Sequence, residues 1–109
     1  MITWDDFEKV DMRVGTIIEI NDFPAARNPA YQLKIDFGEL GLKRSSAQIT
    51  SLYKKEELLH KQVIAVVNFP PKQIGNFMSE CLVMGVYGEN KEVTLIQPER
   101  SIKNGSKIG

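Results

Sequence analysis

Hydrophobic and polar residues alternate most clearly over residues 31–37, where four apolar side chains are separated by Gln32, Lys34 and Asp36. A period of two is typical of a strand that buries one face. Residues 63–67 are continuously apolar and mostly β-branched, which favours a central strand covered on both faces. The predicted strands span residues 12–20, 31–37, 42–49, 63–67, 81–86 and 92–97.

Two segments carry helix signals. Thr3 is followed three positions later by an acidic residue, and this pattern predicts a short capped helix over residues 4–10. Thr50 or Ser51 can cap a second helix that extends through Lys61, with its leucines on one face and its charged residues in solvent. The second segment is predicted to be the only substantial helix.

The order of these elements predicts the fold. Gly15 indicates a bulge or a sharp coil in the first strand, and residues 72–79 are predicted as a loop. Closing a short helix, three strands, a helix and two or three further strands into a barrel hides the strand edges. We therefore predict an all-β fold: an OB-fold five-stranded barrel with a helix between strands 3 and 4 and a short N-terminal helix, forming one domain over residues 1–109.

Composition narrows the environment in which the protein works. The chain has 14 Lys and Arg against 14 Asp and Glu, so it has no global attraction to nucleic acids or acidic membranes. Cys81 is the only cysteine, which excludes an internal disulfide. The first six residues lack the features of a signal peptide, and no apolar run reaches the roughly 18 residues of a membrane span. We expect a cytoplasmic protein without membrane insertion.

Motifs for catalysis are few. Ser51 and Lys54 satisfy S-x-x-K, but no partner motif follows, and a capping serine with a solvated lysine is the preferred interpretation. His60 is the only histidine, and a place at the end of a helix is favoured over catalysis. We expect no enzymatic activity, no cofactor and no metal site.

Local charge is more informative than total charge. Six bases against two acids make residues 43–79 locally basic; the bases are Lys43, Arg44, Lys54, Lys55, Lys61 and Lys72. Such bases can neutralise phosphates, and nearby aromatic residues can offer stacking surfaces. The alternative is a solvated helix face with aromatic residues in the core, and composition alone favours it.

Longer sequence strings resemble a known family. Residues 7–17 (FEKVDMRVGTI), 62–72 (QVIAVVNFPPK) and 79–84 (SECLVM) resemble, in the same order, the tRNA-binding domain family. This OB-fold module is appended to methionyl- and phenylalanyl-tRNA synthetases and is also found free-standing. Residues 35–38, 44–50, 67–71 and 104–109 are similar to strings of a small export-related chaperone within it. The resemblance implies a homodimer that holds unfolded preproteins for export and also binds tRNA or structured RNA.

Three sets of candidate site residues follow. Candidate RNA contacts are Arg13, Lys34, Arg44, Asn68, Lys72, Ser79 and Leu82. Candidate peptide contacts, chosen as apolar residues near loops and strand ends, are Phe37, Phe69, Pro70, Pro71, Ile74 and Phe77, with Leu82 also considered. Candidate dimer contacts are Trp4, Phe7, Ile102 and Ile108.

The sequence also departs from the family pattern. Residues 25–30 replace an Ala-Asp-Lys-Leu phrase of the synthetase-type members, and Leu82 stands where the family's Ser-x-x-Met motif has methionine. Two other hypotheses therefore remain open. The chain can be a free-standing tRNA-binding accessory protein without a chaperone role, or a bare assembly module.

Overall fold

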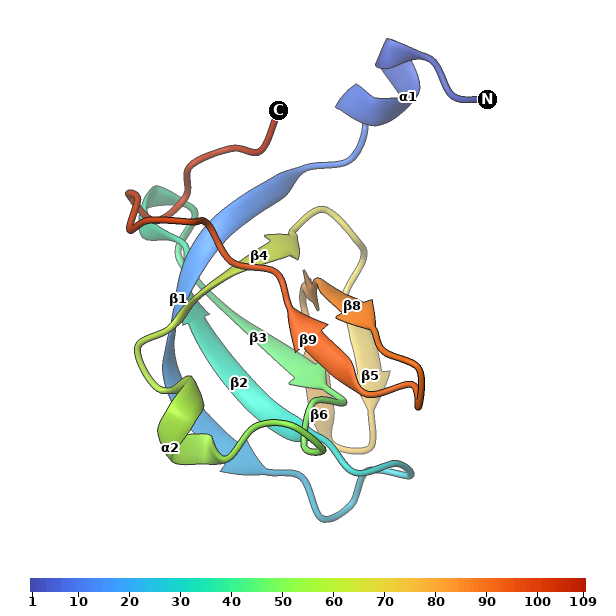
Figure 1. Ribbon diagram of the computed structural model, residues 1–109, viewed down its shortest axis with the longest axis vertical. Coiled ribbons are helices and arrows are strands. Elements are labelled where there is room, and N and C mark those ends of the chain that lie inside the picture. Colours follow the sequence, from blue (N-terminus) through green and yellow to red (C-terminus); the bar gives the residue numbers. More distant parts are fainter.

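A strongly curved sheet forms the body of the protein in the computed structural model, which describes residues 1–109. Its strand order is β3-β2-β1-β4-β7, with every neighbouring pair antiparallel. The strands are β1 (Met12–Asp22), β2 (Tyr31–Asp36), β3 (Leu42–Ala47), β4 (Gln62–Val66) and β7 (Leu82–Val83). The nearly closed barrel in Figure 1 confirms the predicted all-β OB-fold class.

The barrel closes along a seam between β3 and residues 79–81. The Glu80 N–H donates to the Arg44 carbonyl at 2.7 Å, and the Ser46 N–H donates to Ser79 Oγ at 3.1 Å. The Ser45 hydroxyl donates to the Cys81 carbonyl at 3.0 Å. These bonds occupy polar groups on the free edge of β3, which would otherwise pair with another chain.

The N-terminal helix forms as predicted, but the second helix is much shorter than predicted. α1 (Trp4–Glu8) is capped by Thr3, whose Oγ1 accepts from the Asp6 N–H at 3.1 Å. α2 covers only Lys55–Leu58. The cap is at Lys54 rather than at Thr50 or Ser51, because the Glu57 carboxylate accepts from the Lys54 N–H at 2.8 Å.

The second helix also ends before Lys61, and the reason is tertiary. Leu58 is completely buried, and the backbone then turns through His60 at φ 70°. The His60 N–H donates to the Ile17 carbonyl of β1 at 2.8 Å. Bonding to β1 therefore replaces the last helical turn, and His60 follows the helix without continuing it.

The C-terminal half contains more strands than predicted. The predicted loop over residues 72–79 is a hairpin of β5 (Lys72–Ile74) and β6 (Phe77–Ser79), which turns at Gly75 with φ +59°. The predicted strand over residues 81–86 divides into β7 and β8 (Gly85–Tyr87), and β8 pairs with β9 (Val93–Leu95). The division lies at Met84, whose N–H bonds to Ile64 and whose carbonyl accepts from Ile96.

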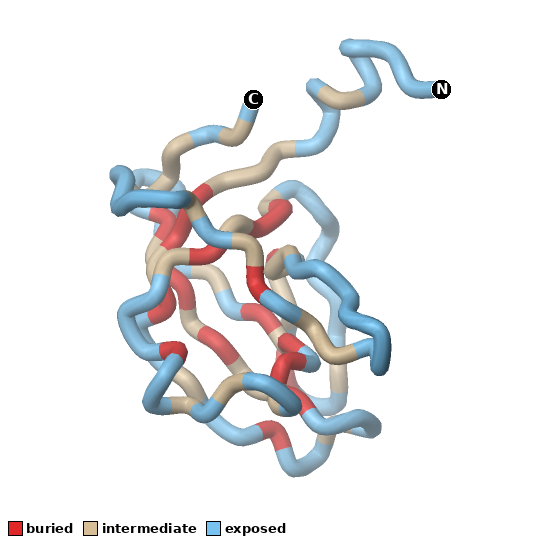
Figure 2. Tube along the Cα trace, in the orientation of Figure 1, coloured by how far each residue is buried: buried red, intermediate tan, exposed pale blue.

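The main core lies inside the barrel, as the distribution of buried residues in Figure 2 shows. Gly15 makes this packing possible, because a Cβ atom there would lie 2.6 Å from Ile35 Cγ2 and 2.7 Å from the Phe37 ring. The bulge predicted at Gly15 is instead a register shift between Ile17 and Glu19. The absence of a side chain at Gly15 therefore allows the Phe37 ring to pack directly against the backbone of β1.

The two termini lie at one end of the barrel. α1 stands away from the barrel in Figure 1, whereas the C-terminal tail follows β1. The Gly105 N–H donates to Val14 at 2.7 Å, and the Ile108 N–H donates to Met12 at 2.9 Å. The 3-10 helix η1 (Gly38–Leu40) lies beside this tail. No helix in the structure has both the length and the apolar character needed to cross a membrane.

Candidate functional site

Polar side chains cover the outer face of β1, β2 and β3. Cross-strand pairing places Glu19 opposite Lys34 and Lys34 opposite Arg44, while Asn21 lies opposite Gln32. These side chains, together with Leu33 and Phe77, surround a hollow of about 220 Å³. We call this surface the polar face; its residues are Glu19, Asn21, Gln32, Lys34, Arg44 and the adjoining Phe77.

The charges of the polar face are only loosely neutralised. Lys34 Nζ lies 3.9 Å from a Glu19 carboxylate oxygen, and both side chains are partly exposed. Arg44 Nε lies 3.8 Å from Glu80 Oε1, and the Arg44 guanidinium lies over the Phe77 ring at 5.2 Å from its centroid. Exposed ion pairs of this length contribute little to stability, so both cations can serve a ligand.

A second hollow lies where the barrel opens beyond the seam. It has a volume of about 470 Å³ and is bordered by the end of β3 and by β7, β8 and β9. We call it the apolar groove; its lining residues include Ile49, Leu82, Val83, Met84, Tyr87 and Val93. Leu82 is 52% exposed and Tyr87 is 80% exposed, so apolar surface is left open to solvent.

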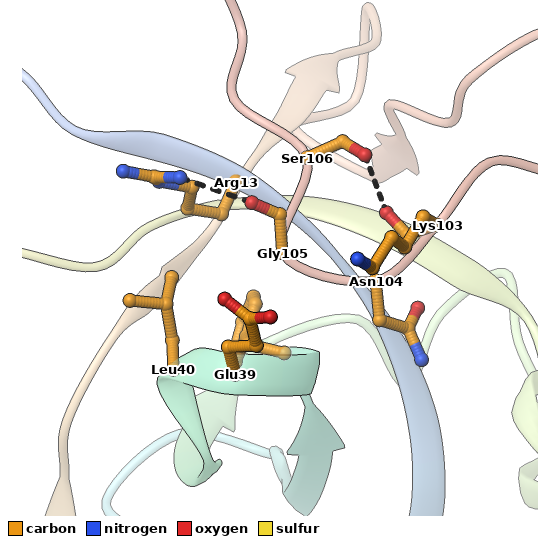
Figure 3. Close-up of a pocket in the computed structure, with 8 residues that line it drawn as sticks. Arg13, Glu39, Leu40, Lys103, Asn104, Gly105 and Ser106 are labelled. Carbon is orange, nitrogen blue, oxygen red and sulfur yellow. Dashed lines mark hydrogen bonds between the residues drawn. The ribbon is translucent and has the colours of Figure 1, made fainter.

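Arg13 does not lie on the polar face. Figure 3 shows its guanidinium reaching the Gly105 carbonyl, with Glu39 and Leu40 on the other side of a small cleft. The Nη1 donor lies 3.0 Å from the Gly105 oxygen, and Nε lies 2.6 Å from Asp11 Oδ1. Arg13 thus fastens the C-terminal tail to β1, and its guanidinium already has two partners within the protein.

Asn68 and Ser79 also have partners within the protein. Asn68 Oδ1 accepts from the Asp11 N–H at 3.0 Å, and its Nδ2 donates to the Lys9 carbonyl at 2.7 Å. Asn68 therefore holds the chain that follows α1, and it is not a free recognition group. Ser79 Oγ belongs to the seam. Lys72, in contrast, is exposed at the start of β5.

The predicted peptide contacts are separated by the fold. Phe37 has no exposed surface, and Phe77 is only 6% exposed, so neither side chain has enough accessible surface to bind a peptide. Phe37 fills the barrel, whereas Phe77 packs on Phe23 with ring centroids 5.4 Å apart, and Ile74 packs beside them. These positions correct the assignment of Phe37 and Phe77 as peptide contacts. Phe69, Pro70 and Pro71 are exposed, but none of the six predicted contacts lines the apolar groove.

Sequence reasoning missed most of the apolar groove. Of these groove residues, only Leu82 is among the contacts predicted from the sequence; Met84, Tyr87 and Val93 are not. The available signal was the apolar run over residues 81–87, which contains Gly85 and is longer than the short strands around it. The run alone could not show which of its side chains would remain uncovered.

Three of the predicted dimer contacts, Trp4, Phe7 and Ile108, lie in the terminal segments at one end of the barrel, whereas Ile102 lies beside Gln62 of β4. Trp4 is 82% exposed and contacts Phe7 edge to face, with ring centroids 6.4 Å apart. Ile102 is half exposed and Ile108 is partly buried in the tail. Lys107 Nζ lies 3.9 Å from a carboxylate oxygen of Glu8, which brings the tail beside α1.

Cys81 is buried, and its surroundings do not activate the thiol. Burial raises the pKa of the Cys81 thiol from its ordinary value of 9.0 to about 12. The thiol is therefore protonated at neutral pH and is a poor nucleophile. The structure contains no group of three or more His, Cys, Asp or Glu side chains placed to bind a metal ion.

Comparison with known proteins agrees with this architecture. A family model described as a putative tRNA binding domain matches residues 12–107. The methionine–tRNA ligase of Pyrococcus abyssi is 35% identical over 107 residues, which are 98% of this chain and 14% of that enzyme. The chain thus spans only a small part of the ligases that it matches.

Solved structures of two chaperones are among those that match the whole chain. The CsaA chaperone protein from Picrophilus torridus is 55% identical, with a TM-score of 0.94 and complete coverage of both chains. The chaperone CsaA from Bacillus anthracis is 50% identical, with a TM-score of 0.95 over 100% of this chain and 99% of that one. Because the family model covers residues 12–107 and both chaperone structures match the chain from end to end, the chain belongs to the tRNA-binding domain family and is, within it, a CsaA-like protein.

Proposed function

We propose that this protein is a CsaA-like cytoplasmic chaperone, in which residues 1–109 act as a single tRNA-binding-type OB-fold domain. Two copies form a homodimer that holds unfolded preproteins before export, and the same dimer binds tRNA or another structured RNA. The observation that carries the proposal is the end-to-end similarity to two structures of CsaA chaperone proteins.

The apolar groove supports the chaperone role. Its lining is mostly hydrophobic, and two of its side chains, Leu82 and Tyr87, are at least half exposed. Covering such surface with the side chains of an extended chain is favourable by roughly 25 cal/mol per Å². Because this gain is not directional, the groove can accept many sequences, as a chaperone requires.

The terminal elements support the homodimer. Trp4 is exposed on α1, Ile2 is exposed just before its N-cap, and the half-exposed Ile102 lies in the chain that leads into the tail. In a twofold dimer each apolar patch can be covered by its copy or by the neighbouring element of the partner. We expect light scattering to give a mass of twice 12.3 kDa.

A double variant tests the interface. Trp4→Ala with Phe7→Ala should shift the particle to the 12.3 kDa monomer, because α1 then offers no aromatic surface. Leu52→Ala is the matched control, since Leu52 is 47% exposed in the turn that precedes α2 and belongs to neither terminal segment. A wild-type protein that is monomeric at all concentrations would refute the homodimer.

The polar face supports RNA binding, which is also the basis of the alternative function. Lys34 and Arg44 on this face, together with the exposed Lys72 at the start of β5, can neutralise phosphates and release counterions. A tRNA-binding accessory protein without a chaperone role would need this face and would make no use of the apolar groove. The two functions therefore differ in whether an unfolded polypeptide binds.

One experiment distinguishes them. A labelled tRNA and a labelled polypeptide, kept unfolded by reduction and alkylation, are titrated with the purified protein at several salt concentrations. We expect tRNA binding to weaken steeply with salt and polypeptide binding to persist. Binding of tRNA alone would establish the accessory function, and binding of neither would refute both.

A further inference from the structure

The hollow of the polar face has the chemistry of a site for a single unpaired base. We propose that it binds one nucleobase of a single-stranded RNA segment, stacked against the Arg44 guanidinium, and that guanine is preferred because its edge hydrogen-bonds to Glu19. This inference rests on the proposed RNA-binding function and specifies where and how a base is recognised.

Arg44 is held in place from several sides. Its N–H donates to Glu80 Oε1 at 3.0 Å, its carbonyl accepts from the Glu80 N–H at 2.7 Å, and its guanidinium lies over the Phe77 ring. The side chain is nevertheless 48% exposed. The two hydrogen bonds fix the backbone of Arg44, while the Phe77 ring and the Glu80 carboxylate, 3.8 Å from Nε, flank its guanidinium. Guanidinium planes stack on bases.

The rim of the hollow carries free hydrogen-bonding groups. Glu19 Oε2 accepts from Asn21 Nδ2 at 3.3 Å, which leaves Oε1 without a hydrogen bond in the protein. The Gln32 side chain also lines the hollow and makes no hydrogen bond within the protein. A carboxylate and an amide at one rim match the edge of a base, which presents both donors and acceptors.

The carboxylate decides which base fits. Guanine presents two neighbouring N–H donors, at N1 and N2, to the two oxygens of one carboxylate, whereas the other three bases present a single donor group on that edge. Glu19 would repel a phosphate placed in the hollow. Lys34 and Arg44 can still attract the phosphates on either side of the base.

Four labelled tetranucleotides test the site: UUGU, UUAU, UUCU and UUUU, titrated at one fixed salt concentration. We expect UUGU to bind about tenfold more tightly than the other three, the scale of one good bidentate base contact. Arg44→Lys keeps the charge but removes the stacking plane, and it should weaken binding of all four by roughly fivefold or more. Glu19→Gln should remove most of the preference for UUGU.

Matched controls lie on the exposed C-terminal segment. Arg100→Lys and Glu99→Gln make the same chemical changes at residues that pair only with each other, and both should bind all four oligonucleotides like the wild type. Thermal unfolding confirms that each variant is folded. If the wild type binds tRNA but shows no base preference, or if Arg44→Lys has no effect, the base site is wrong and RNA binding stands. If the wild type binds neither tRNA nor any tetranucleotide, both are wrong.

Discussion

The polar face and the apolar groove are built along the same strand, yet they differ in chemistry. Arg44 lies where β3 is paired with β2 on one side and sealed to residue 80 on the other. Outward side chains there stand on a continuous sheet and are polar. Beyond Ala47 the strand ends, and the segment from Leu82 to Tyr87 changes from one sheet to another. The groove therefore forms where the barrel ceases to be closed.

This difference implies two independent binding regions. Ligands of the polar face are attracted by charge, and their affinity should depend on salt. Ligands of the apolar groove are held by burial of apolar surface, and their affinity should not. A change that damages the barrel as a whole should abolish both kinds of binding, whereas a change in one region should leave the other intact.

The largest effect is expected at Gly15, because both regions depend on the barrel beneath them. Gly15→Ala places a Cβ 2.6 Å from Ile35 and 2.7 Å from the fully buried Phe37. Overpacking of this kind should lower the free energy of unfolding by about 3 kcal/mol, measured by urea denaturation. Gly75→Ala is the control. A Cβ atom at residue 75 would have no neighbour within 4 Å, so only the positive φ of the backbone should lower the stability, by about 1 kcal/mol. Equal losses would contradict this account of the core.

The next effect concerns the seam that separates the two regions. The pKa of Cys81 is raised from 9.0 to about 12 by burial, so the unfolded chain loses this proton at a lower pH than the folded protein. The stability that the buried, protonated thiol contributes is therefore fully present below pH 9 and is lost as the pH rises toward 12. At pH 10 the loss should be about 1.4 kcal/mol.

Urea denaturation at pH 8 and pH 10 measures this loss. Cys81→Ala provides the comparison, because it should lose less stability over the same interval. If the wild type and Cys81→Ala change by the same amount, the thiol is not protected by the seam.

Leu82 tests the apolar groove alone. Leu82→Ser should weaken binding of the unfolded polypeptide roughly fivefold, since about half of a leucine side chain is available for burial. The affinity for tRNA should not change. Leu52→Ser is a close match, because Leu52 is 47% exposed and lies outside the groove. A loss of tRNA affinity would return Leu82 to the RNA contacts suggested by the sequence.

Lys34 tests the polar face alone, with the smallest effect. Lys34→Ala should reduce the slope of log tRNA affinity against log salt concentration by about one, because one fewer counterion is released on binding. Polypeptide binding should be unchanged. Lys61→Ala, an exposed lysine beyond α2, should alter neither. An unchanged slope for Lys34→Ala would place the RNA elsewhere on the barrel.

The sequence predicts the polar face better than the groove, for a physical reason. Alternation in β2 is local, so Lys34 could be assigned to an outer face from its spacing, and the polar composition of β3 indicates that one of its faces meets solvent. The groove depends on where residues 82–87 leave one sheet and join another, which is set by tertiary hydrogen bonds at Met84. No local pattern encodes that division.

The same limit explains the contacts within the protein that the sequence does not predict. Arg13 and Asn68 have residue types that suit RNA contacts, but their partners, Gly105 and the Lys9–Asp11 segment, are distant in the sequence. Phe37 ends an alternating strand and is predicted as a peptide contact, whereas the absence of a side chain at Gly15 allows its ring into the core. Long-range packing decided each of these positions.

The most direct test of the central claim is whether both ligands bind at once. A fluorescent unfolded polypeptide is first bound to the protein at low salt, and unlabelled tRNA is then added while anisotropy is recorded. If the polar face and the apolar groove are separate, the polypeptide stays bound and the anisotropy rises as a larger complex forms. A fall to the value of free polypeptide, as the tRNA occupies the protein, would contradict the existence of two independent regions.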